Sequence, residues 1–330
     1  MKGMDNKQVY KATLCFSIRR ILWDILGFVA WAAVAAAGFF IADKATDKGL
    51  IGLLIGAAVG LVALVIFLRW VSYKYKAGQI AMMTKGVSEG ELPRDVLAEG
   101  NRIVKSRFGT VAAFFAGTSI IKGIFNQIGR GITAAGQAIG GDNGGTVGSV
   151  ISSAVQVVIS YLCDCCLGWV FYRKEIKSAK ATLEGAVLFF KHGKTLAKNM
   201  GRVFGMGLAS LAVIGGVFSG FFYLIASGFP AAFNGLFNEI TEAATRNGAL
   251  EKLPAWLNSP TALMIAAAVL AGVIVWAMIH SAFIRPFVLV GVLRNYIQSG
   301  MEDIPMESSF AMLDSKSAKF KKLHDEAKAA

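Results

Sequence analysis

The chain has 330 residues, of which 55% are hydrophobic and only 17% are charged, and its formal net charge is +13. This composition is more apolar than a soluble globular domain of this length usually carries, and it excludes that class. The basic residues are unevenly placed, because 28 of the 34 Lys and Arg fall into four segments that alternate with long apolar runs. We therefore predict a polytopic membrane protein that keeps its Lys and Arg in cytoplasmic loops.

Six apolar runs are long enough to cross a bilayer as helices, since a hydrocarbon core about 30 Å thick needs roughly 20 apolar residues. They are residues 21–42, 50–68, 108–128, 147–172, 203–227 and 260–284. The loops between them place 28 basic residues on the predicted cytoplasmic side, five on the outer side and one, Lys122, inside a span. The pattern predicts an all-α integral membrane bundle of about six transmembrane helices, in the cell membrane, with both termini in the cytoplasm.

This threading divides the chain into five parts. They are a basic cytoplasmic N-terminus (1–20), a transmembrane hairpin (21–68), a basic cytoplasmic segment (69–107), a membrane core with four spans (108–299) and a charged helical tail (300–330). The predicted partners are the lipid bilayer and the anionic lipid headgroups on its cytoplasmic side, where each Lys or Arg gains about 1 kcal/mol. That attraction explains the basic charge, so no nucleic-acid partner is expected.

Two cytoplasmic segments have an amphipathic pattern. In residues 178–200, apolar side chains such as Leu183 and Val187 gather on one side, which predicts an interfacial helix between the fourth and fifth spans. The tail has a second apolar stripe, made of Phe310, Leu313, Phe320 and Leu323. We expect the tail to dock on the inner face of the bundle or on another subunit, the second case giving a homo-oligomer.

Small residues at four-residue spacing predict seams where two helices pack closely. Gly52, Gly56 and Gly60 form such a seam in the second span. The fifth span has two further series, namely Gly201, Gly205 and Ala209, followed by Gly216 and Gly220.

Ionisable residues inside spans mark candidate functional positions, because a charge in hydrocarbon is costly unless it is paired or hydrated. Lys122 follows Thr118 and Ser119 and precedes Asn126, so one side of the third span is polar and is expected to face the bundle interior or a wet cavity. Lys122 serves either transport or a structural ion pair with an aspartate. Asp164 and Arg285 lie near the inner ends of spans, where their side chains are expected to reach the interface.

Cys163, Cys165 and Cys166 cluster at the inner end of the fourth span, on the reducing side of the predicted topology, so no disulfide is expected. Structural thiols, acylated thiols and a metal site are the three interpretations, the first being favoured. The sequence has no phosphate-binding loop, nucleophile elbow or zinc-binding H-E-x-x-H motif. We therefore expect no enzymatic activity, no cofactor and no metal.

The order of features from about Asn101 onward resembles the membrane core of the choline transporter-like family. The resemblance rests on a basic lead-in NRIVKSRFGTVAAF, a cluster YLCDCC that closes a span, a basic segment KSAKATLEGAVLFFKHGKTLAKNMGRVF, and a last span that runs through HSAFIRPFVLVGVLRNYIQSG. Members of that family usually have a large extracellular loop after the first span, whereas seven residues stand there in this chain. The resemblance implies a carrier of a choline-like or ethanolamine-like cation.

A quaternary ammonium ion cannot donate hydrogen bonds, so its site is normally a box of aromatic faces, in some cases aided by a carboxylate. The candidate substrate-binding residues are Lys122, Asn126, Asp164, Tyr161, Trp169, Phe222 and Trp276. Transport of a small, choline-like organic cation is the predicted function. The alternative is a non-transporting membrane scaffold or assembly component that recruits partners through its basic cytoplasmic face.

Overall fold

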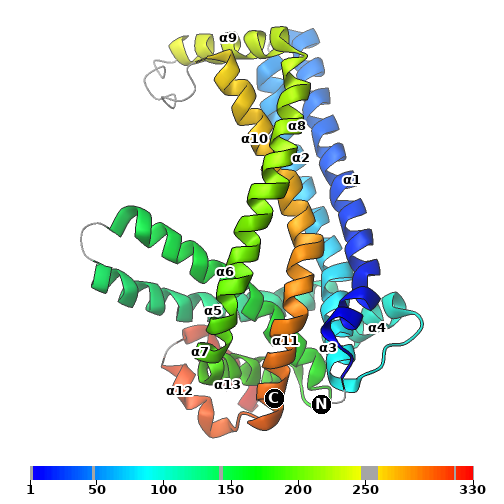
Figure 1. The fold of residues 1–330 in the computed structure, drawn as a ribbon, viewed down its shortest axis with the longest axis vertical. Coiled ribbons are helices and arrows are strands. Elements are labelled where there is room, and N and C mark those ends of the chain that lie inside the picture. The colour runs from blue at the N-terminus through cyan, green and yellow to red at the C-terminus, as the bar shows by residue number, and fades with distance from the viewer. Residues whose placement is uncertain (1–2, 47–48, 141–143, 247–258, 316, 330) are drawn as a thin grey trace. The chain divides into compact units, whose positions relative to one another are not determined.

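The computed structural model describes residues 3–46, 49–140, 144–246, 259–315 and 317–329 (Figure 1). Within these ranges, side chains are described except at residues 50, 111–112, 128–140, 144–155, 158, 192–204, 243 and 329. Helices make up nearly all of the described chain, and no strand occurs in it, which confirms the all-α class.

Four helices of the described chain are long and apolar enough to cross a membrane, and together they establish a helical membrane protein. They cover Asn6–Thr46, Ile51–Glu89, Gly205–Ser227 and Pro260–Glu302. A fifth candidate is a pair of helices, Val96–Phe108 and Ala113–Gln127, bent by 76°. The first and sixth predicted spans fall within these helices, and the second and fifth do so except at residues 50 and 203–204, while a count of six stays a prediction.

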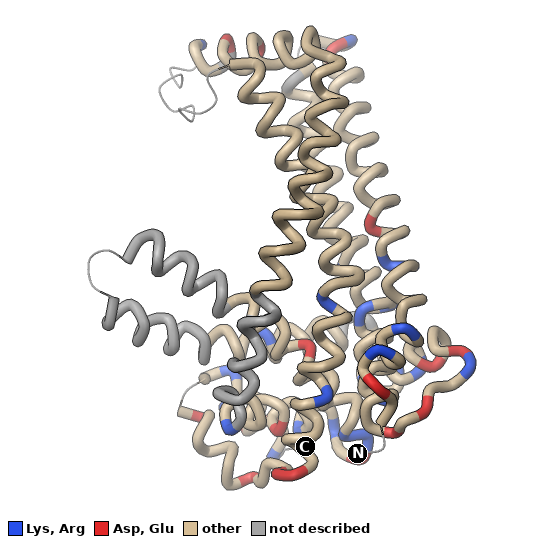
Figure 2. Tube along the Cα trace, viewed as in Figure 1, with Lys and Arg blue, Asp and Glu red and all other residues tan. Residues whose placement is uncertain are grey.

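The chain forms two compact units. Unit 1 consists of Met1–Trp23, Leu68–Phe204 and Phe283–Ala330, and unit 2 of Asp24–Phe67 and Gly205–Ala282. Figure 2 shows that most of the described charges lie in unit 1, and that those of unit 2 lie near the ends of its long apolar helices and in α9 (Pro230–Arg246). Large apolar side chains of unit 2 are exposed, Leu224 by 71% and Val217 by 66%, as a lipid-facing surface requires.

Unit 2 contains the C-terminal part of α1 (Asn6–Thr46) and most of α2 (Gly49–Val71), which pack along the predicted glycine seam. A Cβ atom added to Gly52 would lie 2.1 Å from the Gly38 carbonyl oxygen, and one added to Gly56 would lie 2.7 Å from the Val34 carbonyl oxygen. Since neither distance is tolerable, only glycine allows this approach. The seam predicted at Gly52 and Gly56 is confirmed.

The second half of unit 2 packs η3 (Leu211–Gly215) and α8 (Gly216–Ser227) against α10 (Pro260–Ile279). The close approach is at Gly272, where an added Cβ atom would lie 2.2 Å from Ser219 Oγ. Among the described residues, no atom lies within 4 Å of a Cβ atom added to Gly205, Gly216 or Gly220, so the seam predicted there is wrong: the contact uses the face that carries Gly215 and Ser219. Gly201 falls outside the described side chains. α9 (Pro230–Arg246) connects α8 to the segment before α10.

Besides the N-terminal part of α1, unit 1 contains several further helices. They are α3 (Gly78–Glu89), α4 (Val96–Phe108), α5 (Val111–Gly140), α6 (Gly144–Tyr172), α7 (Ser178–Ser210, up to residue 204), α11 (Arg285–Glu302), η6 (Glu307–Ser309), α12 (Ala311–Asp314) and α13 (Ala318–Ala329). α5 and α6 pack side by side as a hairpin, and α6 also packs on α3 and α11 (Figure 1).

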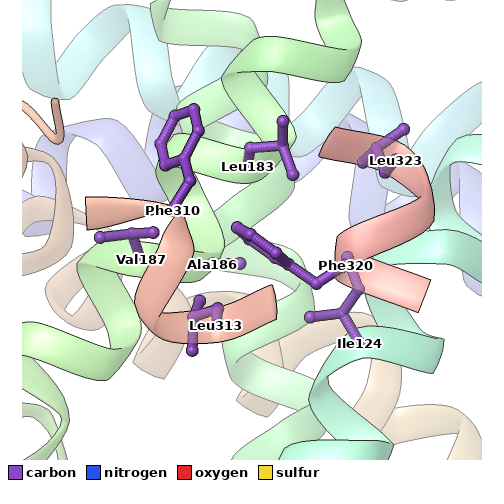
Figure 3. Close-up of a cluster of buried hydrophobic side chains, with 8 residues drawn as sticks. All are labelled: Ile124, Leu183, Ala186, Val187, Phe310, Leu313, Phe320 and Leu323. Atoms are coloured by element: carbon purple, nitrogen blue, oxygen red, sulfur yellow. The ribbon is translucent and has the colours of Figure 1, made fainter. Parts of the chain in front are cut away.

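The C-terminal tail docks on its own chain. Figure 3 shows the four predicted apolar side chains of the tail packed against Ile124 of α5 and against Leu183, Ala186 and Val187 of α7. Ser317 Oγ, at the start of α13, donates a hydrogen bond to Gln127 Oε1 of α5 at 2.5 Å. The predicted apolar stripe is confirmed, and its partner is the α5–α7 surface of the same chain.

The first turns of α7 differ from a helix that lies in a membrane interface. Residues 181–188 are all buried by protein, so every face of this stretch is covered and not only an apolar one. The tail covers Leu183 and Val187, while Tyr296 of α11 donates a hydrogen bond from its hydroxyl to the Gly185 carbonyl. The predicted helix is confirmed, but these turns are internal to unit 1; the side chains of residues 192–200, the rest of the predicted interfacial segment, lie outside those described.

Candidate functional site

A cavity of about 370 Å³ lies within unit 1, between α5, α6 and η1 (Ser72–Ala77), the π-helical segment between α2 and α3. This volume lies in the range of small-molecule sites. Its wall combines hydroxyl groups, the Gln156 amide, the aromatic rings of Phe114 and Phe115, and three charged side chains. The charged side chains are Lys76, Lys122 and Asp164.

The polar side of α5 faces this cavity. Thr118, Ser119 and Lys122 all line it, since residues three and four apart share one face of a helix. Thr118 Oγ1 donates its proton to the Phe114 carbonyl at 2.9 Å, which leaves the oxygen's lone pairs available. Asn126 lies outside the wall, and its Oδ1 atom is buried without a hydrogen-bond partner in the described structure.

Asp164 of α6 is the centre of a charge triad with Lys76 and Arg285. Its side chain is only 6% exposed, Lys76 Nζ lies 2.7 Å from Oδ1, and Arg285 donates from Nε to Oδ2 at 3.1 Å and also from Nη2. Arg285 Nη2 makes a further hydrogen bond of 2.9 Å to the Ser160 carbonyl. Both carboxylate oxygens are therefore occupied by cations of the protein. Asp164 and Arg285 thus meet each other, while their position at the membrane interface stays a prediction.

Both cations of the triad are positioned by breaks in helix regularity. Lys76 is part of η1, and Arg285 directly follows η5 (His280–Ile284), a second π-helical segment. A π segment inserts an extra residue into a helix and turns the following side chains to a new direction, and such segments are frequent at functional sites. Two long helices are thus interrupted at the positions that bring charge to Asp164.

Lys122 has no carboxylate partner among the residues whose side chains are described. The aspartate that shares its cavity, Asp164, is already held by Lys76 and Arg285. Of the two interpretations of Lys122, an ion pair with an aspartate finds no support in this part of the chain.

The predicted aromatic candidates do not form a box. Tyr161 is 3% exposed, and the guanidinium of Arg285 lies over its ring, 5.1 Å from the centroid. Trp169 is fully buried and donates from Nε1 to Glu184 Oε2 at 3.1 Å. The Tyr161 ring is thus covered by a guanidinium of the protein, and the indole N–H of Trp169 is already bonded to a carboxylate.

The remaining two candidates belong to unit 2. Phe222 stacks edge-on against Phe221, with ring centroids 5.7 Å apart, and Trp276 donates from Nε1 to Ser210 Oγ at 3.0 Å. Neither residue lines the cavity. Both residues were predicted as ligand-binding residues from their position in spans alone. Helix packing places both of them outside the cavity.

Sequence reasoning missed Lys76, Ser72 and Gln156 as parts of this cavity. Lys76 was counted with the cytoplasmic basic segment, because it follows a predicted span and stands among other charges. A usable signal was present: the apolar pattern continues after residue 77 through Ile80, Met82 and Met83, all at most 1% exposed. A lysine within such a continuous helix is a candidate for an interior position.

The cysteines of α6 are reduced and mostly enclosed. Cys165 and Cys166 are fully buried, and Cys163 is partly exposed in the cavity wall. The Cys166 thiol lies against the Thr182 carbonyl of α7, with a sulfur–oxygen distance of 3.7 Å. Across the described residues, no group of three or more His, Cys, Asp or Glu is placed to hold a metal ion.

Comparison of the chain with known protein families, characterised proteins and solved structures gave no match. Kinship with the choline transporter-like family therefore stays a prediction. The function has to be inferred from the cavity and its charges.

Proposed function

We propose that this protein carries a small organic solute across the cell membrane and that the cavity of unit 1 is its binding site. The observation that carries the proposal is the cavity itself, with Lys76, Lys122 and Asp164 in its wall. Charged groups in apolar helices are costly, and a bundle that only anchors or assembles partners has no need of a hydrated, charged cavity. Both termini are proposed to be cytoplasmic, as the distribution of Lys and Arg supports.

A second candidate function is the membrane scaffold, which is favoured by the close packing of unit 2. Small residues bring α1 against α2 and α10 against η3 and α8, so these helices are solidly packed where they meet. The basic segments of the chain would face anionic lipid headgroups in either case. The apolar stripe of the tail does not supply a scaffold with a surface for binding partners, because α5 and α7 of the same chain already cover it.

A flux experiment separates the two functions. Protein with Cys15→Ser, which leaves Cys163 as the partly exposed thiol, is reconstituted in liposomes and tested for uptake of radiolabelled choline, succinate and phosphate. A carrier moves at least one probe, and a small methanethiosulfonate reagent that modifies Cys163 in the cavity wall blocks this uptake. The matched control is Cys15→Ser with Cys163→Ser, whose uptake the reagent leaves unchanged. Absence of flux for all probes would support the scaffold.

A further inference from the structure

We infer that the cavity of unit 1 binds the anionic group of its ligand, a carboxylate or a phosphate, and not a quaternary ammonium ion. This inference rests on the proposed function in one respect, that the cavity is a ligand site. It adds the chemical class of the ligand, and it reverses the sign of the charge that a choline-like substrate would have.

The first reason is the balance of charge around the cavity. Lys76 and Lys122 line it, Arg285 lies behind it on Asp164, and Asp164 is the one described carboxylate in its wall. Three cations against one anion leave an excess of two positive charges. Such an excess repels a cationic ligand and attracts an anionic one.

The second reason is that Asp164 has no free oxygen for a ligand cation. Lys76 occupies Oδ1, and two N–H groups of Arg285 occupy Oδ2. A choline-like ligand would have to displace an internal cation, which would then be buried without its partner. Removing one member of a buried ion pair is strongly unfavourable, so this exchange is disfavoured.

The third reason is that the groups left available in the wall suit an anion. Lys122 Nζ lacks a carboxylate partner in the described structure, and Lys76 uses one ion-pair contact, to Asp164. Ser72, Ser119 and Gln156 add neutral groups that can donate hydrogen bonds to ligand oxygens. Hydrogen bonds between such donors and a charged oxygen are stronger than those between neutral groups.

The aromatic side of the cavity supports an apolar part of the ligand and not a cation. The Phe114 ring meets Tyr73, Phe108 and Phe115 edge-on, with centroids 5.2, 5.4 and 5.3 Å away. These neighbours fix it as part of an aromatic cluster, and a cation box needs several open ring faces turned to one point. A small organic acid or phosphate ester whose carbon part rests on Phe114 and Phe115 meets these constraints.

The test measures protection of Cys163, the thiol in the cavity wall, from a small uncharged methanethiosulfonate. Full-length protein with Cys15→Ser is placed in nanodiscs of zwitterionic lipid, and modification is timed with succinate, inorganic phosphate, choline or tetramethylammonium present. We expect succinate or phosphate to slow the modification and both amines to leave it unchanged. In a parallel arm, nanodiscs containing phosphatidylglycerol and no soluble anion show whether a lipid headgroup occupies the site instead.

Substitutions at Lys122 connect protection to the proposed contact. Lys122→Met should weaken protection by the anion about 10- to 100-fold, as expected for a lost charge-assisted hydrogen bond, and Lys122→Arg should largely retain it. The matched control is Lys74→Met, a neighbouring lysine of η1 whose Nζ lies 5.0 Å from the Trp70 ring centroid and which does not line the cavity. It should leave protection unchanged. If Lys122→Met fails to fold, Lys122→Gln, which also lacks the charge, takes its place: weaker protection in Lys122→Gln than in Lys122→Arg supports the contact, and equal protection in the two variants would contradict it.

The outcomes keep this inference and the proposed function apart. Protection by choline or tetramethylammonium without protection by any anion would overturn the anionic class and leave a carrier standing. Protection by an anion without flux in liposomes would overturn transport and leave the anion site. Protection from phosphatidylglycerol alone would support the anion site and identify its ligand as a lipid headgroup. No protection in any arm would overturn the anion site, and the flux experiment alone would then decide between carrier and scaffold.

Discussion

Asp164→Asn should destabilise unit 1 because it leaves two cations without their carboxylate. Removing one partner of a buried ion pair typically costs about 3–5 kcal/mol. Here the side chains of Lys76 and Arg285 are 30% and 21% exposed, so hydration relieves part of that penalty. We therefore expect a loss of about 2–4 kcal/mol, below the full cost of a completely buried pair.

The order of effects within the triad follows from the same geometry. Lys76→Met should cost less than Asp164→Asn, because Arg285 still neutralises the carboxylate through two N–H groups. The double variant should be more stable than Asp164→Asn alone, because the unpaired lysine is removed with its partner.

Unfolding by SDS in mixed micelles, followed by circular dichroism, measures these differences. Glu242→Gln is the control, since Glu242 and Arg246 form an exposed pair with side chains 68% and 77% accessible, and such pairs contribute about 0–1 kcal/mol. If Asp164→Asn were no more costly than Glu242→Gln, or if the double variant were less stable than Asp164→Asn, the account of the triad would be refuted.

Three further predictions concern the tail, the glycine seam and the topology. Phe320→Ala should cost about 3–5 kcal/mol of tail docking and raise hydrogen exchange in α13, whereas Lys322→Ala, whose side chain is 80% exposed, should not. Gly52→Ala should lower the melting temperature because its Cβ would collide with backbone of α1, while Gly220→Ala, which faces open space, should have little effect; equal shifts would contradict the seam. In a cysteine-free background, Thr245→Cys on α9 should react with an impermeant maleimide in intact cells and Lys322→Cys should not, and the opposite result would invert the proposed orientation.

Patterns in the amino-acid sequence are sufficient to assign the class of this protein and to predict several of its local contacts. Long apolar runs require a membrane, and small residues four apart require a close neighbour at Gly52 and Gly56 whichever helix supplies it. The apolar stripe of the tail could also be predicted, because large apolar side chains such as Phe310 and Phe320 are stabilised by burial against another apolar surface. In each case a periodic pattern within one segment fixes which face is buried, and no knowledge of the partner is needed.

Which segments meet could not be predicted from these patterns and is seen in the folded chain. Asp164 pairs with Lys76 and Arg285, which come from two helices far from it in the chain. Each of these cations is positioned by a π-helical segment, and no residue pattern predicted either segment. Tyr161 and Trp276 looked alike as aromatic residues in spans, yet packing places them in different units. Periodicity gives the orientation of a side chain about its own helix axis, whereas the neighbour that it meets depends on how whole helices pack, and this is decided by contacts between residues far apart in the chain.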